Sequence, residues 1–323
     1  MFWCLNIVKN NTLPFFSYFR SHKMKSERYT YKIFNLHLHS AMPLPELSLA
    51  DTPEQADIHI VFGPVPDMLE NCTVRGVCFQ AVPKKILFTY KRIGKFLITN
   101  GNTITIDSAP GADEREIKSF ILGTCMGNLL SQRGLFVLHG NVVVTNDKAI
   151  VICGSSGAGK SSLAAAFCRR GFALLADDVA AISWHNDIPF VLPAFPYIKL
   201  WEDTAKMLGM EPDPQQNVWP GLKKYRFRYD NNFYDKACIP TKIIILSTKN
   251  TPDIRIDQLQ GMNKFTMLKN NTYRLRVLDG LGLKEQHFMH CAKLAAQTEV
   301  YHVARPIHID VNILAEHSRK IFG

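Results

Sequence analysis

Long apolar runs are missing from this sequence: none approaches the roughly 18 residues that a membrane-spanning helix needs, so we predict no transmembrane segment. The first 23 residues, MFWCLNIVKNNTLPFFSYFRSHK, have neither a basic start nor a small-residue cleavage site, which argues against a secretory signal. We therefore expect residues 1–23 to be a loosely attached extension, and Met24 to begin an ordinary cytoplasmic protein.

Paired cysteine motifs are also missing, although the chain has eight cysteines. None belongs to a C-x-x-C pair, which removes the usual signature of a structural zinc site or a redox-active dithiol. Cys125, Cys153 and Cys168 fall inside apolar strand or helix patterns. We expect buried, unpaired cysteines in a reducing compartment.

A concentrated block of Lys and Arg is absent as well, even though the formal net charge is +10. The positive charge is spread along the chain and no recognised nucleic-acid-reading module is present, so we expect no nucleic-acid partner. A nucleotide or an acidic peptide remains compatible with the charge. Apolar residues make up 46% of the sequence and charged residues 20%, which predicts a globular protein with a substantial core.

Short alternating segments fill the first third of the chain and predict a β-rich region over residues 24–110. The clearest is ITNGNTITID, in which Asn100-Gly101 separates two strand-like runs and predicts a hairpin. Pro110-Gly111 marks a boundary, after which a helical stripe begins with Asp113 as a candidate N-cap and Glu116 as its capping-box partner. We expect a second region over residues 111–323.

The segment LFVLHGNVVVTNDKAIVIC predicts a β-hairpin with its turn at Asn146-Asp147, and its second strand leads into GSSGAGKS, residues 154–161. A helix is expected next, ending near Gly171, followed by the short strand FALLA. The loop therefore follows the second arm of an antiparallel hairpin, and we predict an α/β fold with a mixed sheet.

GSSGAGKS matches the pattern G-x-x-x-x-G-K-[ST], in which backbone N–H groups of a glycine-rich loop surround a phosphate chain. We expect Lys160 to reach the β- and γ-phosphates of ATP and the Ser161 hydroxyl to bind Mg²⁺. The residues predicted to contact the nucleotide are Gly154, Ser155, Ser156, Gly157, Ala158, Gly159, Lys160, Ser161 and Ser162.

Asp177 and Asp178 directly follow the strand FALLA, where an acidic residue commonly helps to hold the magnesium ion. Adjacent strand residues point to opposite sides unless a local bend brings them together. If both face the phosphates, one can hold the metal while the other accepts a proton from an attacking hydroxyl. The alternative is one metal ligand and one solvated aspartate. His139, before Gly140 in the hairpin, is either close to the γ-phosphate or a packed turn residue.

The stretch GSSGAGKSSLAAAFCRRGFALLADDV, with the upstream His139-Gly140, resembles the core of the HPr serine kinase/phosphorylases. The resemblance implies a kinase domain related in fold to phosphoenolpyruvate carboxykinase, ATP and Mg²⁺ as cofactors, and a homo-oligomer as a possible assembly. It also implies Asp177 as the general base, Asp178 and Ser161 as magnesium ligands, and Lys160 and His139 as further catalytic residues. The order of the two aspartates stays open.

The glycine-rich signature E-x-R-G-x-G of that family is absent, and PAFPYIKLWEDTAKMLG stands at residues 193–209 instead. Together with GLKKYRFRYD (221–230), IPTKIIILS (239–247), LHLHSAMPLPEL (36–47) and SQRGLFVLHG (131–140), this segment makes the chain similar to the HPr-kinase-related proteins of lasso-peptide gene clusters, which phosphorylate the C-terminal serine of a precursor peptide. The resemblance therefore implies a peptide or small-protein serine as the acceptor. An HPr-like carrier protein is the alternative acceptor, and a nucleotide-binding regulator without phosphate transfer is the alternative function.

Two basic features lie outside this core. KKYRFRY predicts a strand with Lys224, Arg226 and Arg228 on one face, either solvated or available to a substrate carboxylate or a nucleotide phosphate. Lys199, in YIKLW, is a candidate for the same role. A guanine-specific switch is disfavoured because the sequence has no N-K-x-D motif, and a carboxykinase acting on a small acid would need further metal ligands that the sequence does not offer.

Overall fold

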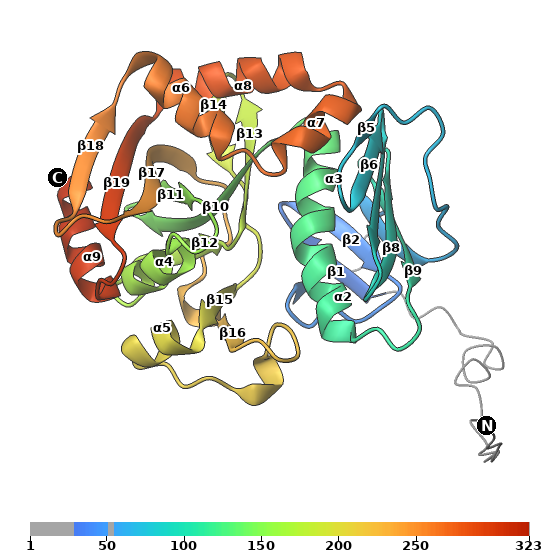
Figure 1. Ribbon diagram of the computed structural model, residues 1–323, viewed down its shortest axis with the longest axis horizontal. Coiled ribbons are helices and arrows are strands. Elements are labelled where there is room, and N and C mark those ends of the chain that lie inside the picture. Colours follow the sequence, from blue (N-terminus) through green and yellow to red (C-terminus); the bar gives the residue numbers. More distant parts are fainter. Residues whose placement is uncertain (1–28, 51–54, 323) are drawn as a thin grey trace, which may run out of the picture.

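The protein, analysed as a computed structural model that describes residues 29–50 and 55–322, has a mixed α/β fold with two large mixed sheets and a small two-stranded sheet (Figure 1). The fold class agrees with the alternation of strand and helix patterns in the sequence. The expected N-terminal extension, residues 1–23, lies outside the described residues.

The first sheet is built entirely from residues 29–108 and has the strand order β3-β1-β2-β4-β9-β8-β7-β6-β5. Its side chains alternate as expected, so that Phe96, Ile98, Ile104 and Ile106 are buried on one face. The strands are β1 (Tyr29–Ile33), β2 (Leu36–Ser40), β3 (Ser48–Leu49), β4 (Ile58–Phe62), β5 (Val74–Arg75), β6 (Phe79–Val82), β7 (Lys85–Tyr90), β8 (Gly94–Thr99) and β9 (Thr103–Ser108).

The second sheet has the order β14-β13-β10-β11-β17-β19-β18, and β12 also pairs with β10. Strands β11, β17 and β19 are parallel to one another, whereas β10 is antiparallel to β11, so the predicted mixed sheet is confirmed. Its strands are β10 (Phe136–Thr145), β11 (Lys148–Gly154), β12 (Ala173–Ala176), β13 (Val179–His185), β14 (Ile188–Val191), β17 (Ile239–Lys249), β18 (Arg255–Leu259) and β19 (Glu299–Pro306).

Helices cover both faces of the second sheet, and a separate ribbon of two strands lies beside it (Figure 1). The ribbon consists of β15 (Tyr197–Trp201) and β16 (Lys224–Arg228). The helices are α2 (Glu114–Phe120), α3 (Met126–Gln132), α4 (Lys160–Cys168), α5 (Glu202–Met207), α6 (Gly261–Asn270), α7 (Leu275–Leu281), α8 (Lys284–Gln297) and α9 (Val311–Ser318).

Alternate side chains of β10 enter two different cores. Val142 belongs to a core that continues through α3 into the first sheet, while Val143 belongs to a core shared with α4, α9 and the β15–β16 ribbon. The second sheet is therefore packed on both faces, which explains why its central strands are apolar almost throughout.

The helical stretch α2–α3 stands between the two sheets (Figure 1). Asp113 caps it as predicted by accepting a hydrogen bond from the Arg115 N–H, but Glu116 pairs with Arg92 instead of completing a capping box. A π-helical turn at residues 121–125, which the sequence did not indicate, joins the two helices. The predicted stop holds, because Gly134 has a φ of 83° just after α3 ends.

The predicted hairpins are confirmed, as is the burial of Cys125, Cys153 and Cys168, whereas Cys72 and Cys78 are only partly buried. Both Asn146 and Asp147 have positive φ between β10 and β11, as a tight hairpin turn requires. The cysteines of the described residues are free, and five of them are buried: Cys125, Cys153, Cys168, Cys238 and Cys291. No helix within residues 29–50 and 55–322 has the length and apolar character needed to cross a membrane.

Candidate active site

The glycine-rich loop connects the end of β11 at Gly154 to the start of α4 at Lys160, which is the strand–loop–helix arrangement predicted from GSSGAGKS. Gly154 has a φ of 143°, and a Cβ added there would lie 2.4 Å from the Leu246 carbonyl oxygen. Gly159 has a φ of 99° at the residue before the helix. Only glycine tolerates both the positive φ and the close approach of the Leu246 carbonyl at position 154, so the tight curve of the loop depends on Gly154.

Lys160 is held inside this curve, with 7% of the residue exposed. Its ammonium donates hydrogen bonds to the Gly154 carbonyl at 2.9 Å and to the Ser155 carbonyl at 3.2 Å. Burial lowers the pKa of Lys160, and the nearby Asp178 opposes that shift. The ammonium is thus positioned at the mouth of the loop, where a phosphate chain would enter.

The two aspartates lie at a break between β12 and β13, which pair with the same edge of β10. Ala176 is opposite Val142 and Val179 is opposite His139, and the two aspartates occupy the gap. Asp178 adopts a left-handed conformation with φ of 66°, a state that Asp and Asn tolerate better than most residues.

This bend is what brings both carboxylates to one side. The Lys199 ammonium lies 2.5 Å from Asp178 Oδ2 and 3.6 Å from Asp177 Oδ2, and the Lys199 backbone N–H donates to Asp177 Oδ2 at 3.2 Å. The alternative of one aspartate facing away into solvent is therefore wrong.

Asp177 is the inner member of the pair, and its side chain has 0% exposed surface. The Ser161 hydroxyl donates to Asp177 Oδ1 at 3.1 Å, and the Asn141 side-chain amide donates to the same oxygen. Asp178 is the outer member, with 26% of its side chain exposed. The two adjacent carboxylates therefore occupy different environments, one against the helix that follows the loop and one at the surface of the site.

The charges around the pair also shift the pKa values of the two carboxyl groups in opposite directions. Burial raises the pKa of Asp177 above its ordinary value, and the neighbouring Asp178 adds to this. Burial would also raise the pKa of Asp178, but Lys199 and then Lys224 lower it below its ordinary value. Asp178 is consequently ionised at neutral pH.

His139 lies next to the bend and is packed on both sides. Its Nδ1 is 3.2 Å from the Asp178 carbonyl oxygen, and its ring meets the Tyr273 ring edge to face at 5.7 Å. Burial and the charge of Lys160 lower the pKa of His139, so the ring is neutral at pH 7.

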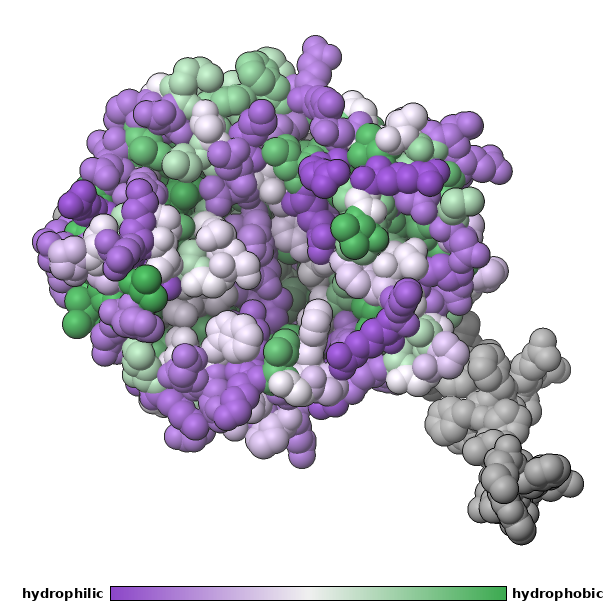
Figure 2. Space-filling model, in the orientation of Figure 1, coloured by the Kyte–Doolittle hydropathy of each residue, from purple (hydrophilic) through white to green (hydrophobic). Residues whose placement is uncertain are grey.

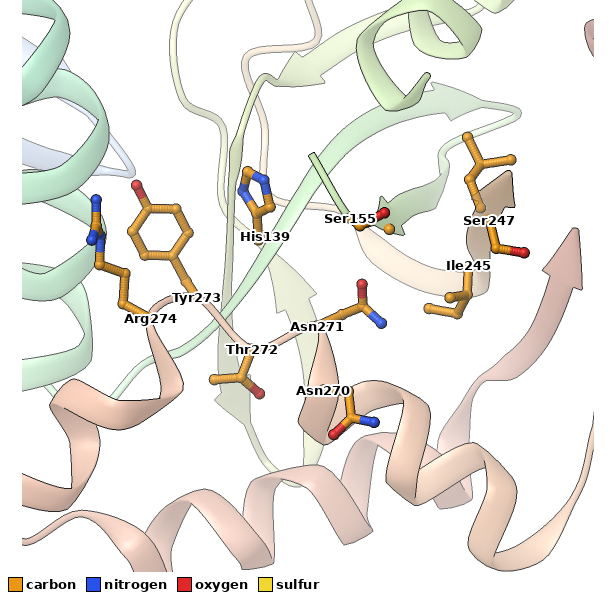
Figure 3. A pocket seen from close by; sticks show the side chains of 11 residues that line it. His139, Ser155, Ile245, Ser247, Asn270, Asn271, Thr272, Tyr273 and Arg274 are labelled. Carbon is orange, nitrogen blue, oxygen red and sulfur yellow. The ribbon is translucent and has the colours of Figure 1, made fainter. Parts of the chain in front are cut away.

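Tyr273 belongs to a short connecting segment, residues 271–273, which pairs with β10 where β11 does not reach. The His139 N–H donates to the Asn271 carbonyl and the Tyr273 N–H to the Val137 carbonyl, each at 2.8 Å. We call residues 271–273 the strap. The strap forms one wall of a cavity of about 530 Å³ that opens beside the glycine-rich loop and is also lined by His139, Ser155 and Ser247 (Figure 3). Figure 2 shows the corresponding face of the molecule hollowed between its two halves.

The sequence analysis did not identify three parts of the site: Asn141, Arg305 and the strap. Asn141 is a polar residue inside an apolar strand, a signal that could have been followed. Arg305, at the end of β19, donates to the Ala158 carbonyl at 2.8 Å and the Gly157 carbonyl at 3.3 Å, and thereby holds the loop from behind. The strap carries no sequence signal, because its position depends on pairing with a strand more than 130 residues earlier.

The basic strand predicted from KKYRFRY is β16, and its charged face turns toward the aspartates. A fully solvated basic face is a wrong description of it, because Arg226 is only 9% exposed and lies 3.9 Å from Glu46. Lys199, on the partner strand β15, reaches the aspartates directly.

The donor set fits a magnesium ion bound together with a nucleotide. Ser161 and Asp177 supply oxygen ligands, as Mg²⁺ prefers, and they converge next to the loop. No group of three or more His, Cys, Asp or Glu side chains that could hold a metal occurs within the described ranges 29–50 and 55–322. Two protein oxygens suit Mg²⁺, which keeps several waters and takes further ligands from phosphates.

Comparison with known proteins adds little beyond these observations. No protein-family model and no curated protein matches the chain. Among solved structures, the HPr(Ser) kinase/phosphatase from Coxiella burnetii is similar at 17% sequence identity and a TM-score of 0.29, over 58% of this chain and 99% of that chain.

Proposed function

We propose that the protein is an ATP- and Mg²⁺-dependent kinase that transfers the γ-phosphate to a serine hydroxyl of a peptide or small protein. The observation that carries the proposal is the convergence of Lys160, Ser161, Asp177 and Asp178 at one end of the glycine-rich loop. A nucleotide-binding regulator needs a loop and a metal ligand, whereas a kinase also needs a second carboxylate for the proton of the acceptor.

The geometry favours Asp177 and Ser161 as the magnesium ligands and Asp178 as the general base. Asp177 has no exposed side-chain surface and contacts the hydroxyl of Ser161, the other proposed metal ligand, so it lies deeper in the site than Asp178. Asp178 is partly exposed and ionised, so it can accept the proton. The family resemblance implies the opposite roles, with Asp177 as the base and Asp178 as the metal ligand, but leaves open which aspartate has which role.

The chain's residues would act together in one displacement. The acceptor hydroxyl loses its proton to Asp178 as its oxygen bonds to the γ-phosphorus, and the bond from that phosphorus to the β,γ-bridging oxygen breaks to leave ADP. Lys160 would hold the phosphate chain in the loop, and neutral His139 would keep the Asp178 backbone in its bent conformation through its contact with the carbonyl. Bound Mg²⁺ would neutralise negative charge on the phosphates.

The acceptor is proposed from the sequence resemblance, which implies the C-terminal serine of a lasso-peptide precursor. Incubation of candidate serine peptides with ATP and Mg²⁺, followed by mass spectrometry, tests it. Addition of one phosphate to the terminal serine supports this acceptor, whereas modification of an HPr-like carrier protein and of no peptide would contradict it.

Substitution of each aspartate tests the assignment of roles. Asp178→Asn removes the base but suits the left-handed backbone, and we expect transfer to fall by roughly 10²- to 10⁴-fold while nucleotide affinity is retained. Asp177→Asn should raise the Mg²⁺ concentration needed for half-maximal rate, and Lys160→Ala should weaken both ATP binding and transfer.

Steady-state kinetics with Mg²⁺ titrations and direct nucleotide binding make these measurements. Near-normal transfer by Asp178→Asn, together with loss of transfer but normal Mg²⁺ dependence in Asp177→Asn, would return the base to Asp177.

A further inference from the structure

The β15–β16 ribbon has one buried face and one face directed at the aspartates. Ile198, Leu200 and Phe227 are buried in the core around α4. Successive strand residues alternate, so Lys199 and Trp201 lie on the opposite face, and the contact between Lys199 and Asp178 shows where this face points.

The pairing register adds further cations to this face. Lys224 is opposite Trp201, Arg226 is opposite Lys199, and Arg228 is opposite Tyr197. Directly opposite residues of an antiparallel pair share a face, so four cations lie on the ribbon face from which Lys199 contacts the aspartates.

Three of these four cations have carboxylate partners within the protein. Lys199 binds the two catalytic aspartates, Arg226 pairs with Glu46, and Arg228 pairs with Asp230. Lys224 differs: over the described residues, no Asp or Glu oxygen lies within ion-pair distance of its ammonium. The ammonium is instead 5.7 Å from the centre of the Trp201 ring, which is 47% exposed.

The charge of Lys224 nevertheless acts on the catalytic centre. It contributes to lowering the pKa of Asp178, after burial and Lys199 have acted, and it also lowers the pKa of Lys160. Its place agrees with this, because Lys224 lies on the same face of the ribbon as Lys199, which contacts Asp178.

The ribbon lies on the acceptor side of the site. The nucleotide phosphates have their own ligands in the loop and Lys160, and the ribbon contacts Asp178, the group that must touch the acceptor hydroxyl. A single ammonium on a flexible stem binds a compact anion such as a carboxylate, and the Trp201 ring offers an apolar surface for the atoms next to it.

We infer that Lys224 and Trp201 form a subsite for a carboxylate that the acceptor carries close to its serine hydroxyl. The inference deepens the proposed kinase function and rests on it for the identity of the acceptor side. Two sources share this chemistry: the terminal carboxylate of a peptide that ends in serine, and the side chain of an acidic residue that follows an internal serine.

Peptide binding tests the subsite without requiring transfer. The full chain, saturated with Mg²⁺ and a non-hydrolysable ATP analogue, is titrated against fluorescent peptides that end in serine, either as the free acid or as the amide. A second pair carries an internal serine followed by Asp or Asn. We expect the acid form of at least one pair to bind about tenfold or more tightly than its neutral form, as one charge-assisted contact allows.

Lys224→Gln should reduce this preference to near onefold and leave the affinity for the ATP analogue unchanged, while Lys224→Arg should retain most of it. Lys223→Gln is the matched control, because the neighbouring Lys223 pairs with Glu202 and not with the site. It should keep the full preference.

The outcomes separate this inference from the kinase proposal. Equal binding of acid and neutral peptides by the unmodified protein, or an unchanged preference in Lys224→Gln, would overturn the subsite. Weaker nucleotide binding by Lys224→Gln with an intact peptide preference would assign Lys224 to a phosphate and would overturn it too. A preference that depends on Lys224, without phosphate transfer to any acceptor, would support the subsite and contradict the kinase.

Discussion

At the scale of single residues, Lys199 sets the state of the aspartate pair. It contacts Asp177 through its backbone N–H and both aspartates through its ammonium, although it lies on a different sheet from either. Two adjacent carboxylates would otherwise repel each other in a buried site. Lys199 therefore acts as a positioning residue that keeps Asp178 ionised.

Removal of this cation should move the pH dependence of the reaction. The titratable groups that face Asp178 are Asp177, neutral His139, Lys160 and Lys224 besides Lys199 itself. Lys199 lowers the pKa of Asp178, so Lys199→Met raises it, and the base becomes protonated at a higher pH. We expect the acidic limb of the kcat/KM profile to shift to higher pH, because transfer requires the ionised carboxylate.

Lys199→Arg provides the matched control, because it keeps the charge and should keep the limb near its original position. A lower rate in Lys199→Met with an unmoved acidic limb would show that Lys199 only supports the structure. Because the pKa of Asp178 in the unmodified protein lies below the ordinary carboxyl value, its acidic limb lies below about pH 4, and a limb that enters the range from about pH 4 to 9 in Lys199→Met distinguishes the two.

At the scale of elements, the glycine-rich loop depends on a strand that is distant in sequence. Arg305, at the end of β19, donates hydrogen bonds to the carbonyls of Gly157 and Ala158 and so fixes this part of the loop from outside. Arg305→Gln shortens the side chain and removes this support, so we expect ATP affinity to fall by roughly tenfold, the effect of about one charged hydrogen bond.

Binding of a fluorescent ATP analogue measures this effect. Arg255→Gln, on the neighbouring strand β18 and exposed, is the control and should bind as the unmodified protein does. Equal affinities for the two variants would show that the loop holds its shape without Arg305.

Local signals in the sequence predicted the elements that carry the nucleotide end of the site. The hairpin turn, the loop glycines and the helix after Lys160 each depend on neighbouring residues, and the structure has all of them. The sequence identified Asp177 and Asp178, but it did not predict the bend that turns both carboxylates to one side, which was only named as the condition for a shared site. Left-handed backbone at a non-glycine residue is uncommon, and here it depends on the tertiary contacts of the Asp178 carbonyl with Gly140 and His139.

The surroundings of the aspartates and the cavity were less predictable, because their residues come from segments that meet only in three dimensions. Lys199 reaches the aspartates from a strand of the separate ribbon, and the strap pairs with β10 across more than half of the second region. Neither arrangement follows from periodicity or turn chemistry, which report on contacts within a few residues.

At the scale of the whole molecule, the two regions expected on either side of Pro110-Gly111 share one core. The nine-stranded sheet ends at Ser108, but the apolar cluster beneath it continues through α2 and α3 to the second sheet. Phe120 is at the centre of the first part of this cluster, with ring contacts to Phe88 and Phe96 at 5.6 and 4.6 Å. We expect the two regions to unfold together.

Phe120→Ala tests this cooperativity. It should lower the free energy of unfolding by about 3–5 kcal/mol, the usual cost of removing a buried aromatic ring, and denaturation followed by circular dichroism and by tryptophan emission should give one coincident transition. Val77→Ala is the control, because Val77 is fully exposed and its loss should change stability by less than about 0.5 kcal/mol. Two separate transitions would show that the regions are independent domains.

Strand β10 changes partners on both edges at nearly the same place. On one edge the strap ends and β11 begins around His139 and Gly140, and on the other edge β13 gives way to β12 over residues 139–142. In the language of crystals, the candidate site occupies a dislocation in an otherwise regular sheet. Displacement of the strap would break two backbone hydrogen bonds and leave the β10–β11 ladder intact. The cavity wall formed by the strap can therefore change while the frame that carries His139 and Asn141 stays in register.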